Sequence, residues 1–336
     1  MKICLIGEYS EDLEEGMRKI AFHLSKELSK RHDVLSLNIK KIFSKDFWKE
    51  IKDFKPQIIH YIPGPSIVSF IIVKALAFYC KGAKTVVSAT HPSHFRFSKN
   101  IVPFLKPDLI LTQSHGSERM FIDLGCKTEF LPSGVDVEKF IPVSKEVKKE
   151  LRERYDIDED KFIILHVGSV KEGRGIEIFK NIQTKGDQVI IVGNKSMGVE
   201  KQIFRGIKES GCKIWIKYFN NIEEIYVLSD CYIFSTPPMN KTNSIEIPLS
   251  IVEAMSCNLP VITTKFEALP RIFKEGNGLI FVNKEEEFID ALKKIKKTDR
   301  DIKTREKVLP YAWENIVERL EKIYEKLVFN SKGGDG

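Results

Sequence analysis

The chain has 336 residues, of which 42% are hydrophobic and 30% are charged, and its formal net charge is +7. This length suits two domains better than one, and the composition is ordinary for a soluble globular enzyme. The modest positive charge favours anionic ligands, such as nucleotide diphosphates, or an acidic membrane surface. The basic stripes with interleaved aromatic residues that single-strand nucleic-acid binders use are missing, so nucleic acid is not an expected partner.

Cysteine spacing and the apolar segments indicate in which cellular compartment the protein is expected. The six cysteines form no CxxC pair, so neither zinc binding nor redox chemistry is indicated. The apolar run near the N-terminus is too short for a signal peptide. The most apolar stretch, Ile67–Cys80, carries Lys74 and is shorter than the roughly 20 residues that a bilayer requires. We expect a buried helix there, and a cytoplasmic protein with reduced thiols.

The first half of the chain alternates apolar strands with helices. Ile20, Leu24 and Leu28 recur every four residues, which indicates a helix. Such alternation predicts a parallel sheet with helices on both faces. The expected elements are a strand at Lys2–Ile6, a helix at Gly16–Lys30, a strand at Asp33–Leu37, a helix through Phe43 to Phe54, a strand at Gln57–Ile62, the apolar helix, strands at Thr85–Ala89 and Leu109–Thr112, a helix at Ser117–Leu124, and a strand at Thr128–Leu131.

A break near residue 142 precedes a second series of strands. Turn residues cluster there, and a charged helix over Ser144–Tyr155 follows. The chain is therefore expected to form two Rossmann-like α/β domains, residues 1–142 and 143–309, which face a cleft. An amphipathic helix over 310–329 and a disordered tail, residues 330–336, follow. The second series comprises Phe162–Val167, Gln188–Val192, Lys213–Ile216, Cys231–Ser235 and Val261–Thr263.

The segment Ser244–Val282 reads as an acidic helix, a strand, a loop and a second strand. Together with other blocks in chain order, it resembles the GT-B-fold glycosyltransferases of retaining family 4, the glycosyl transferases group 1. The blocks in the first half are FKPQIIHYIP, VVSATHPSHF, LKPDLILTQSHGSERMFIDLG and FLPSGVDVEKFIP. Those in the second half are FIILHVGSVKEGRGIEIF, NIEEIYVLSDCYIFSTP and YAWENIVERLEKIYEKL.

The resemblance implies a fold and a reaction. In this family the closing helix, here 310–329, crosses back to the first domain. The family transfers a sugar from a nucleotide-diphosphate sugar with retention of configuration, and it needs no metal or other cofactor. The expected acceptor is a glycan, a lipid-linked molecule or a small molecule. No protein nucleophile is expected, because the leaving phosphate itself can take the proton of the acceptor.

The loop Gly168–Gly175 is expected to hold the donor diphosphate. The family uses an Arg and a Lys in this loop, and here these positions read Ser169 and Arg174. We expect Arg174, with Lys171, to bind the phosphates, because a guanidinium can contact phosphate through two parallel hydrogen bonds. Gly168 would permit close approach of the backbone to the ligand.

The acidic helix provides the expected contacts to the nucleoside and the donor sugar. Glu253 matches the second carboxylate of the family's E-x7-E element, which accepts hydrogen bonds from ribose hydroxyls, and Leu249 begins the same helix on the donor side. The first carboxylate is displaced: Ile245 holds its position, and Glu246 comes one residue late, before Pro248. Either Glu246 swings into the family position as a catalytic group, or the enzyme lacks that group.

The remaining site residues belong to the first domain. His91 follows the strand Thr85–Ala89 and corresponds to a family histidine that contacts the donor sugar or the reacting phosphate, so it is a second catalytic candidate. His60 ends the neighbouring strand on the acceptor side. Gly16 marks the start of the first helix, where the family places a glycine pair. Acids precede Gly16 here, so the acceptor is either neutral near this loop or held by Arg18 and Lys19.

The segment Lys40–Lys55 holds six lysines and an apolar stripe that includes Phe43 and Phe54. The stripe can pack inward as part of the domain, while the lysines approach anionic lipid at the inner membrane surface. Two alternatives to the transferase stay open. One is a non-catalytic scaffold subunit, favoured by Ser169 and the displaced Glu246, and the other is a nucleotide-sugar epimerase on the same fold.

Overall fold

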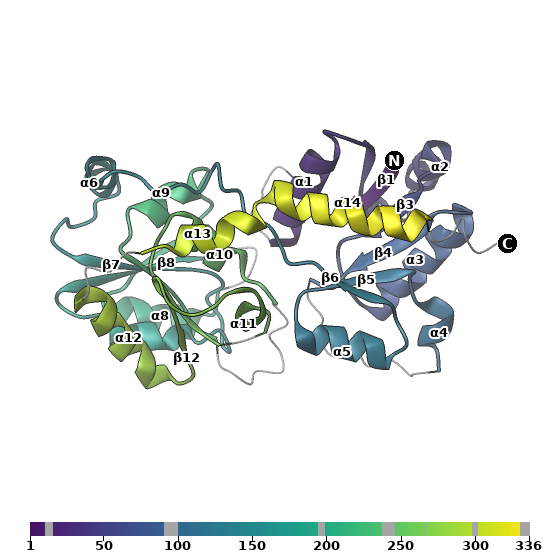
Figure 1. Cartoon of the computed structure of the whole chain (residues 1–336). Helices are drawn as coiled ribbons and strands as arrows, with labels where there is room; N and C mark the ends of the chain where they lie inside the picture. The colour runs from purple at the N-terminus through teal and green to yellow at the C-terminus, as the bar shows by residue number, and fades with distance from the viewer. Residues whose placement is uncertain are drawn as a thin grey trace. The chain divides into compact units, whose positions relative to one another are not determined.

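The computed structural model describes residues 1–10, 16–90, 100–193, 199–236, 246–265, 267–297 and 302–329. The chain forms two compact units (Figure 1). The first comprises Met1–Gly134, Ser244–Ile247 and Trp313–Gly336, and the second comprises Val135–Asn243 and Pro248–Ala312. The first crossing between the units thus falls after Gly134, whereas the composition of the sequence placed the boundary near residue 142.

The first unit is built on a six-stranded sheet in which every neighbouring pair is parallel. Its strand order is β2-β1-β3-β4-β5-β6. The inner strands are continuous runs of buried apolar residues, as expected for a parallel sheet covered on both faces. The strands are β1 (Lys2–Gly7), β2 (Asp33–Asn38), β3 (Ile58–Tyr61), β4 (Lys84–Ser88), β5 (Leu109–Thr112) and β6 (Thr128–Phe130).

Serine side chains fix the starts of three helices in the first unit. Ser44, Ser66 and Ser114 each accept a hydrogen bond from the backbone N–H three residues later, which satisfies a donor that the helix itself leaves unpaired. The last helix packs along the first, as Figure 1 shows. The helices are α1 (Gly16–Leu28), α2 (Lys45–Phe54), α3 (Ile67–Tyr79), α4 (Val102–Leu105), α5 (His115–Asp123) and α14 (Trp313–Phe329).

The second unit repeats the architecture with the strand order β12-β11-β10-β7-β8-β9, again parallel throughout. Its strands are β7 (Phe162–Val167), β8 (Asp187–Gly193), β9 (Lys213–Ile216), β10 (Cys231–Phe234), β11 (Val261–Thr264) and β12 (Leu279–Val282). Its helices are α6 (Lys145–Arg154), α7 (Phe179–Ile182), α8 (Lys201–Glu209), α9 (Ile222–Val227), α10 (Leu249–Ser256), α11 (Leu269–Ile272), α12 (Glu285–Lys297) and α13 (Thr304–Val308).

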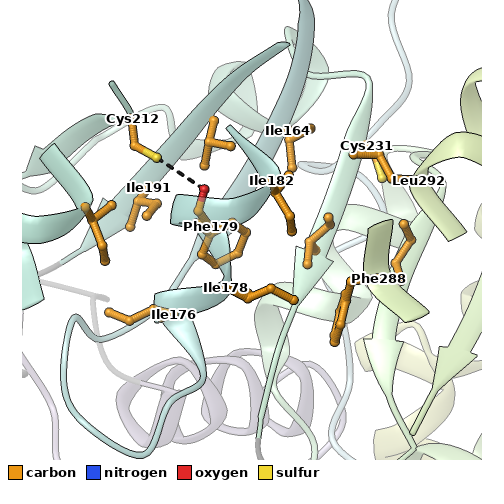
Figure 2. Packing of buried hydrophobic residues seen from close by; sticks show 14 of the residues in the cluster. Ile164, Ile176, Ile178, Phe179, Ile182, Ile191, Cys212, Cys231, Phe288 and Leu292 are labelled. Carbon is orange, nitrogen blue, oxygen red and sulfur yellow. Dashed lines mark hydrogen bonds between the residues drawn. The ribbon is translucent and has the colours of Figure 1, made fainter. Parts of the chain in front are cut away.

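Isoleucine dominates the core of the second unit. Figure 2 shows Phe179 surrounded by the side chains of several isoleucines, with Phe288 and Leu292 of α12 at one end of the cluster. The thiol of Cys212 donates to the carbonyl oxygen of Phe179 at 3.6 Å. This cysteine is therefore a small core residue, and the two parallel sheets confirm the predicted α/β class.

Two expectations about apolar surfaces were wrong. Phe43 does not pack inward with the α2 stripe: it precedes the helix and is 97% exposed, because the serine cap at Ser44 starts α2 after it. The helix over 67–80, now α3, is not buried on all sides, since Phe78 is 80% exposed. No helix in the described ranges is long and apolar enough to cross a bilayer.

Candidate functional site

The carboxyl ends of the strands in the second unit gather most of the predicted donor-binding residues. The loop that starts at Gly168 follows β7, and Ser235 follows the neighbouring strand β10. Helix α10 of the same unit begins at Leu249, which is half-buried. Ligands of doubly wound sheets bind at this edge, so these segments form a coherent candidate site.

Two glycines of the β7 loop are required by their surroundings. Gly175 has a φ of 64°, and a Cβ there would overlap the hydroxyl oxygen of Ser235. A Cβ at Gly168 would lie 2.9 Å from Nε2 of His166. Both positions therefore admit only glycine without rearrangement. The loop is held close to β10 and to the buried histidine beneath it.

Arg174 is a half-buried cation at this edge. Its guanidinium makes no hydrogen bond or ion pair with any residue that the structure describes, and burial lowers its pKa. Arginine nevertheless stays protonated at neutral pH, because its ordinary pKa is above 12. A half-buried positive charge that lacks a carboxylate partner is stabilised by a bound anion. Lys171, also half-buried, adds a second cation to the same loop.

His166 supplies an acceptor atom that the sequence did not predict to be part of the site. Its Nδ1 lies 3.0 Å from the carbonyl oxygen of Ile233, and a carbonyl only accepts, so Nδ1 carries the proton. Nε2 is then an acceptor, and it is buried without a partner among the described atoms, as is the hydroxyl of Thr236. Burial lowers the pKa of His166 to about 4, with a smaller effect from the charge of Arg174. The imidazole is neutral at physiological pH.

Glu253 lies in α10 and is only 4% exposed. The hydroxyl of Tyr226, from α9, donates a hydrogen bond of 2.8 Å to Oε2 of Glu253. Burial and the neighbouring carboxylate together hold the pKa of Tyr226 well above its usual value, so the phenol keeps its proton. Tyr226 thus orients Glu253, the residue predicted to contact the ribose hydroxyls. The role of Tyr226 is visible only in the structure, because the two residues are distant along the chain.

Glu246 is grouped with the first unit, whereas Glu253 belongs to the second. Its carboxylate is buried and accepts hydrogen bonds from the backbone N–H of Gln113 at 3.0 Å and from the hydroxyl of Ser114 at 2.6 Å. Ser114 caps α5, so the carboxylate also lies at the positive end of a helix. In this structure Glu246 is an anionic partner for the start of α5.

A charged cluster occupies the carboxyl end of β1 in the first unit. Glu8 accepts hydrogen bonds from Arg18 at 2.6 and 3.0 Å and from Lys40 at 2.7 Å. The hydrogen bond from Lys40 is the largest cause of the lowered pKa of Glu8, and Arg18 adds to it. Gly16 begins α1 beside this cluster. The predicted acceptor-side cation Arg18 is therefore already engaged by Glu8, which the sequence analysis did not single out.

His60 is fully buried, and both of its ring nitrogens have partners within the first unit. Nδ1 lies 2.6 Å from the hydroxyl of Tyr324 in α14, and Nε2 lies 2.7 Å from the hydroxyl of Ser88 at the end of β4. Burial lowers the pKa of His60 to about 3. An acceptor could bind His60 only by replacing one of these bonds. His91 lies outside the described residues.

No group of three or more His, Cys, Asp or Glu side chains with metal-binding geometry occurs in the described ranges. The candidate site of the second unit offers cations and a carboxylate. The loop provides Arg174 and Lys171, and α10 provides the carboxylate of Glu253. Cations suit a diphosphate, and a carboxylate suits a pair of vicinal hydroxyls.

Two parallel, helix-covered sheets define a two-domain Rossmann-like architecture. The GT-B fold is confirmed by solved structures of similar shape. Anabaena Alr3699/HepE, in complex with UDP and glucose, matches with a TM-score of 0.74 and 15% identity over 97% of this chain and 100% of that one. Sucrose-phosphate synthase from Thermosynechococcus elongatus matches with a TM-score of 0.77 and 16% identity over 98% and 99% of the two chains.

The sequence gives the family as well as the fold. Residues 147–323, more than half of the chain, match the family glycosyl transferases group 1, and the chain belongs to this family. Among curated relatives, the alpha-galactosylglucosyldiacylglycerol synthase of Streptococcus pneumoniae is 25% identical over 213 residues, which cover 60% of this chain and 55% of that protein. The chain spans little more than half the length of the curated relatives that it matches.

Proposed function

We propose that the protein transfers a sugar from a nucleotide-diphosphate sugar, with retention of configuration and without a metal ion. The observation that carries this proposal is the half-buried guanidinium of Arg174, which has no protein partner among the described residues and lies at the carboxyl edge of a parallel sheet. Family membership supports the reaction class. The solved complex of Alr3699/HepE with UDP and glucose supports a nucleotide-sugar donor.

The second unit is proposed to bind the donor. Arg174 and Lys171 contact the diphosphate and stabilise the negative charge that builds on it as the anomeric bond breaks. Glu253, held by Tyr226, accepts hydrogen bonds from the ribose hydroxyls. Gly168 lets the backbone approach the phosphates, and Leu249 packs against the donor. The leaving phosphate takes the acceptor proton on the same face of the sugar, so no protein base is assigned.

The first unit is proposed to bind the acceptor, with Gly16, Arg18 and His60 on that side and His91 and Glu246 near the reaction centre. The acceptor is a glycan, a lipid-linked molecule or a small molecule. The name of the Streptococcus pneumoniae relative, a glycolipid synthase, supports a lipid acceptor. We place the reaction in the cytoplasm.

A product analysis tests the reaction. The protein is incubated with each of a panel of nucleotide-diphosphate sugars and a set of diacylglycerol, glycan and polyol acceptors, with and without EDTA. The anomeric configuration of the product is then determined by NMR. We expect a new glycoside that keeps the donor configuration and forms equally well with EDTA. An inverted product, or activity abolished by EDTA, would contradict the mechanism. Conversion of the free donor without an acceptor would favour an epimerase. Absence of any product, together with no thermal shift for any nucleotide, would favour a scaffold.

A further inference from the structure

Helix α3 is apolar on nearly all of its sides, although it lies at the surface. Its inward face buries Phe70, Val73 and Leu76. A helix that is apolar all round is normally covered on every side, by protein or by lipid. Its outward face carries exposed apolar residues near both ends of the helix: Ile67 at 46%, Val68 at 62%, Ile71 at 50%, Phe78 at 80% and Tyr79 at 39% exposure.

Helix α4 extends this apolar surface. Phe104 is 74% exposed and Ile101, just before the helix, is 51% exposed. The two helices pack beside each other, as Figure 1 shows. A groove of about 490 Å³ borders them, lined by residues of both helices and of the strand starts nearby. Exposed apolar patches of this kind mark interaction surfaces in soluble proteins.

Positive charge predominates on this surface. From residue 54 to residue 107 the sequence contains no Asp or Glu, while lysines recur through it. Lys74 and Lys106 line the groove together with Lys84 and Lys127. The acid in the lining is Asp108, and it already accepts hydrogen bonds from the backbone and hydroxyl of Thr85 and lies 3.9 Å from Lys84. Lys106 donates a hydrogen bond of 2.7 Å to the carbonyl oxygen of Gly125, which is neutral and leaves the lysine charge uncompensated. The groove therefore presents an excess of positive charge to an incoming ligand.

We propose that this α3–α4 face, defined as the exposed side chains of Val68, Ile71, Phe78 and Phe104 with the groove lysines Lys74 and Lys106, docks on an anionic lipid bilayer. The apolar side chains enter the boundary between headgroups and acyl chains, and the groove receives a phospholipid phosphate. This surface is distinct from the lysine-rich segment 40–55, and the inference does not depend on the proposed sugar transfer.

A bilayer fits this face better than a second copy of the chain does. In a two-fold dimer the same patch forms both sides of the interface, so the positively charged groove of one copy would be brought close to that of the other. Juxtaposed like charges disfavour such a pairing. An anionic membrane offers an apolar interior and negatively charged headgroups together, which complement the apolar side chains and the lysines of the face.

Vesicle co-sedimentation of the full chain tests the proposal. Vesicles of phosphatidylcholine alone are compared with vesicles that also contain phosphatidylglycerol. We expect binding to the anionic vesicles, weakened about tenfold or more in the double variant Phe78→Ser/Phe104→Ser. The double variant Lys74→Gln/Lys106→Gln should lose roughly fivefold in affinity per lysine, and only on the anionic vesicles.

Matched controls come from α14 in the same unit. Phe329 is 68% exposed, and Lys322 and Lys326 are exposed, so Phe329→Ser removes one exposed phenylalanine and Lys322→Gln/Lys326→Gln removes two exposed lysines outside the face. These controls should bind as the unaltered protein does. The proposal is overturned if the protein ignores anionic vesicles, or if the controls lose as much binding as the test variants. It is also overturned if Phe78→Ser/Phe104→Ser instead dissolves a dimer seen by analytical ultracentrifugation. Thermal melting verifies that every variant is folded.

Discussion

The hydroxyl of Tyr226 and Oε2 of Glu253 lie 2.8 Å apart inside the second unit, and both side chains are buried. A carboxylate can only accept, so the tyrosine donates. This bond holds the side chain of Glu253, the proposed contact to the ribose hydroxyls, in one rotamer before any nucleotide binds. It joins α9 to α10, two helices that precede and follow β10 in the chain.

Replacing this donor should weaken both the fold and the site. Tyr226→Phe keeps the aromatic packing against Phe140 but leaves a buried carboxylate short of one hydrogen bond. We expect the free energy of unfolding to fall by about 1–3 kcal/mol, measured by urea denaturation, and nucleotide affinity to fall with it. Unchanged stability would mean that the bond contributes nothing to the position of Glu253.

Arg174→Ala should separate binding from stability. The guanidinium has no partner among the described residues, so its removal should leave the free energy of unfolding unchanged or raise it slightly. Loss of a charge-assisted contact to the diphosphate should cost about 2 kcal/mol of binding, roughly thirtyfold in Kd, measured by calorimetry. Arg205→Ala, an exposed arginine of α8, is the control and should change neither quantity.

The β7 loop should not tolerate a side chain at Gly175. Alanine there would adopt a left-handed φ and would overlap the hydroxyl of Ser235. We expect Gly175→Ala to lower the free energy of unfolding by about 1–3 kcal/mol and to weaken nucleotide binding. Gly186→Ala is the matched control, because a Cβ there meets nothing within 4 Å. Equal effects of the two substitutions on chemical denaturation would show that the loop geometry is not constrained as described.

Two buried histidines predict a loss of stability in acid. The pKa of His60 is lowered to about 3 and that of His166 to about 4, from an ordinary value of 6.5. As the pH falls below 6.5, the unfolded chain binds protons that the folded chain does not, so the free energy of unfolding decreases. The decrease continues until the folded pKa values are reached, with a slope of up to about 1.4 kcal/mol per pH unit for each histidine.

The variant His60→Gln/His166→Gln tests this linkage, because it removes both titrating groups. Urea denaturation between pH 6.5 and 4 should give a shallower pH dependence for the variant than for the unaltered protein, even if its stability at pH 7 is lower. Parallel curves for the two proteins would mean that these histidines take up protons in the folded state at their ordinary pKa.

The sequence predicted the sheets because apolar strands such as Phe162–Val167 are local signals. It also singled out Arg174 and Glu253, whose places follow from short motifs. It did not predict Tyr226, His166 or Glu8, because their roles depend on partners that are distant along the chain. The hydrogen bond of Glu246 was not predicted for the same reason, because its partner Ser114 is 132 positions away.

The periodicity of apolar residues also could not predict which side chains are exposed at the surface. The apolar spacing of Ile67–Tyr79 identifies a helix but cannot tell which of its faces other elements cover. The structure shows that neighbouring elements cover only the side with Phe70 and Val73. Phe43 was misplaced for a similar reason, since the cap at Ser44, and not the apolar stripe, sets where α2 begins.

The central claim is that the second unit binds a nucleoside diphosphate through Arg174 and Glu253. Thermal stability measured against a panel of nucleoside diphosphates and their sugar conjugates tests it most directly. A ligand at 100 times its Kd should add about 2.7 kcal/mol of stability. We predict a shift with one base of the panel, lost in Arg174→Ala and Glu253→Ala and kept in Arg205→Ala. No shift with any nucleotide, or a shift that survives Arg174→Ala undiminished, would contradict the account.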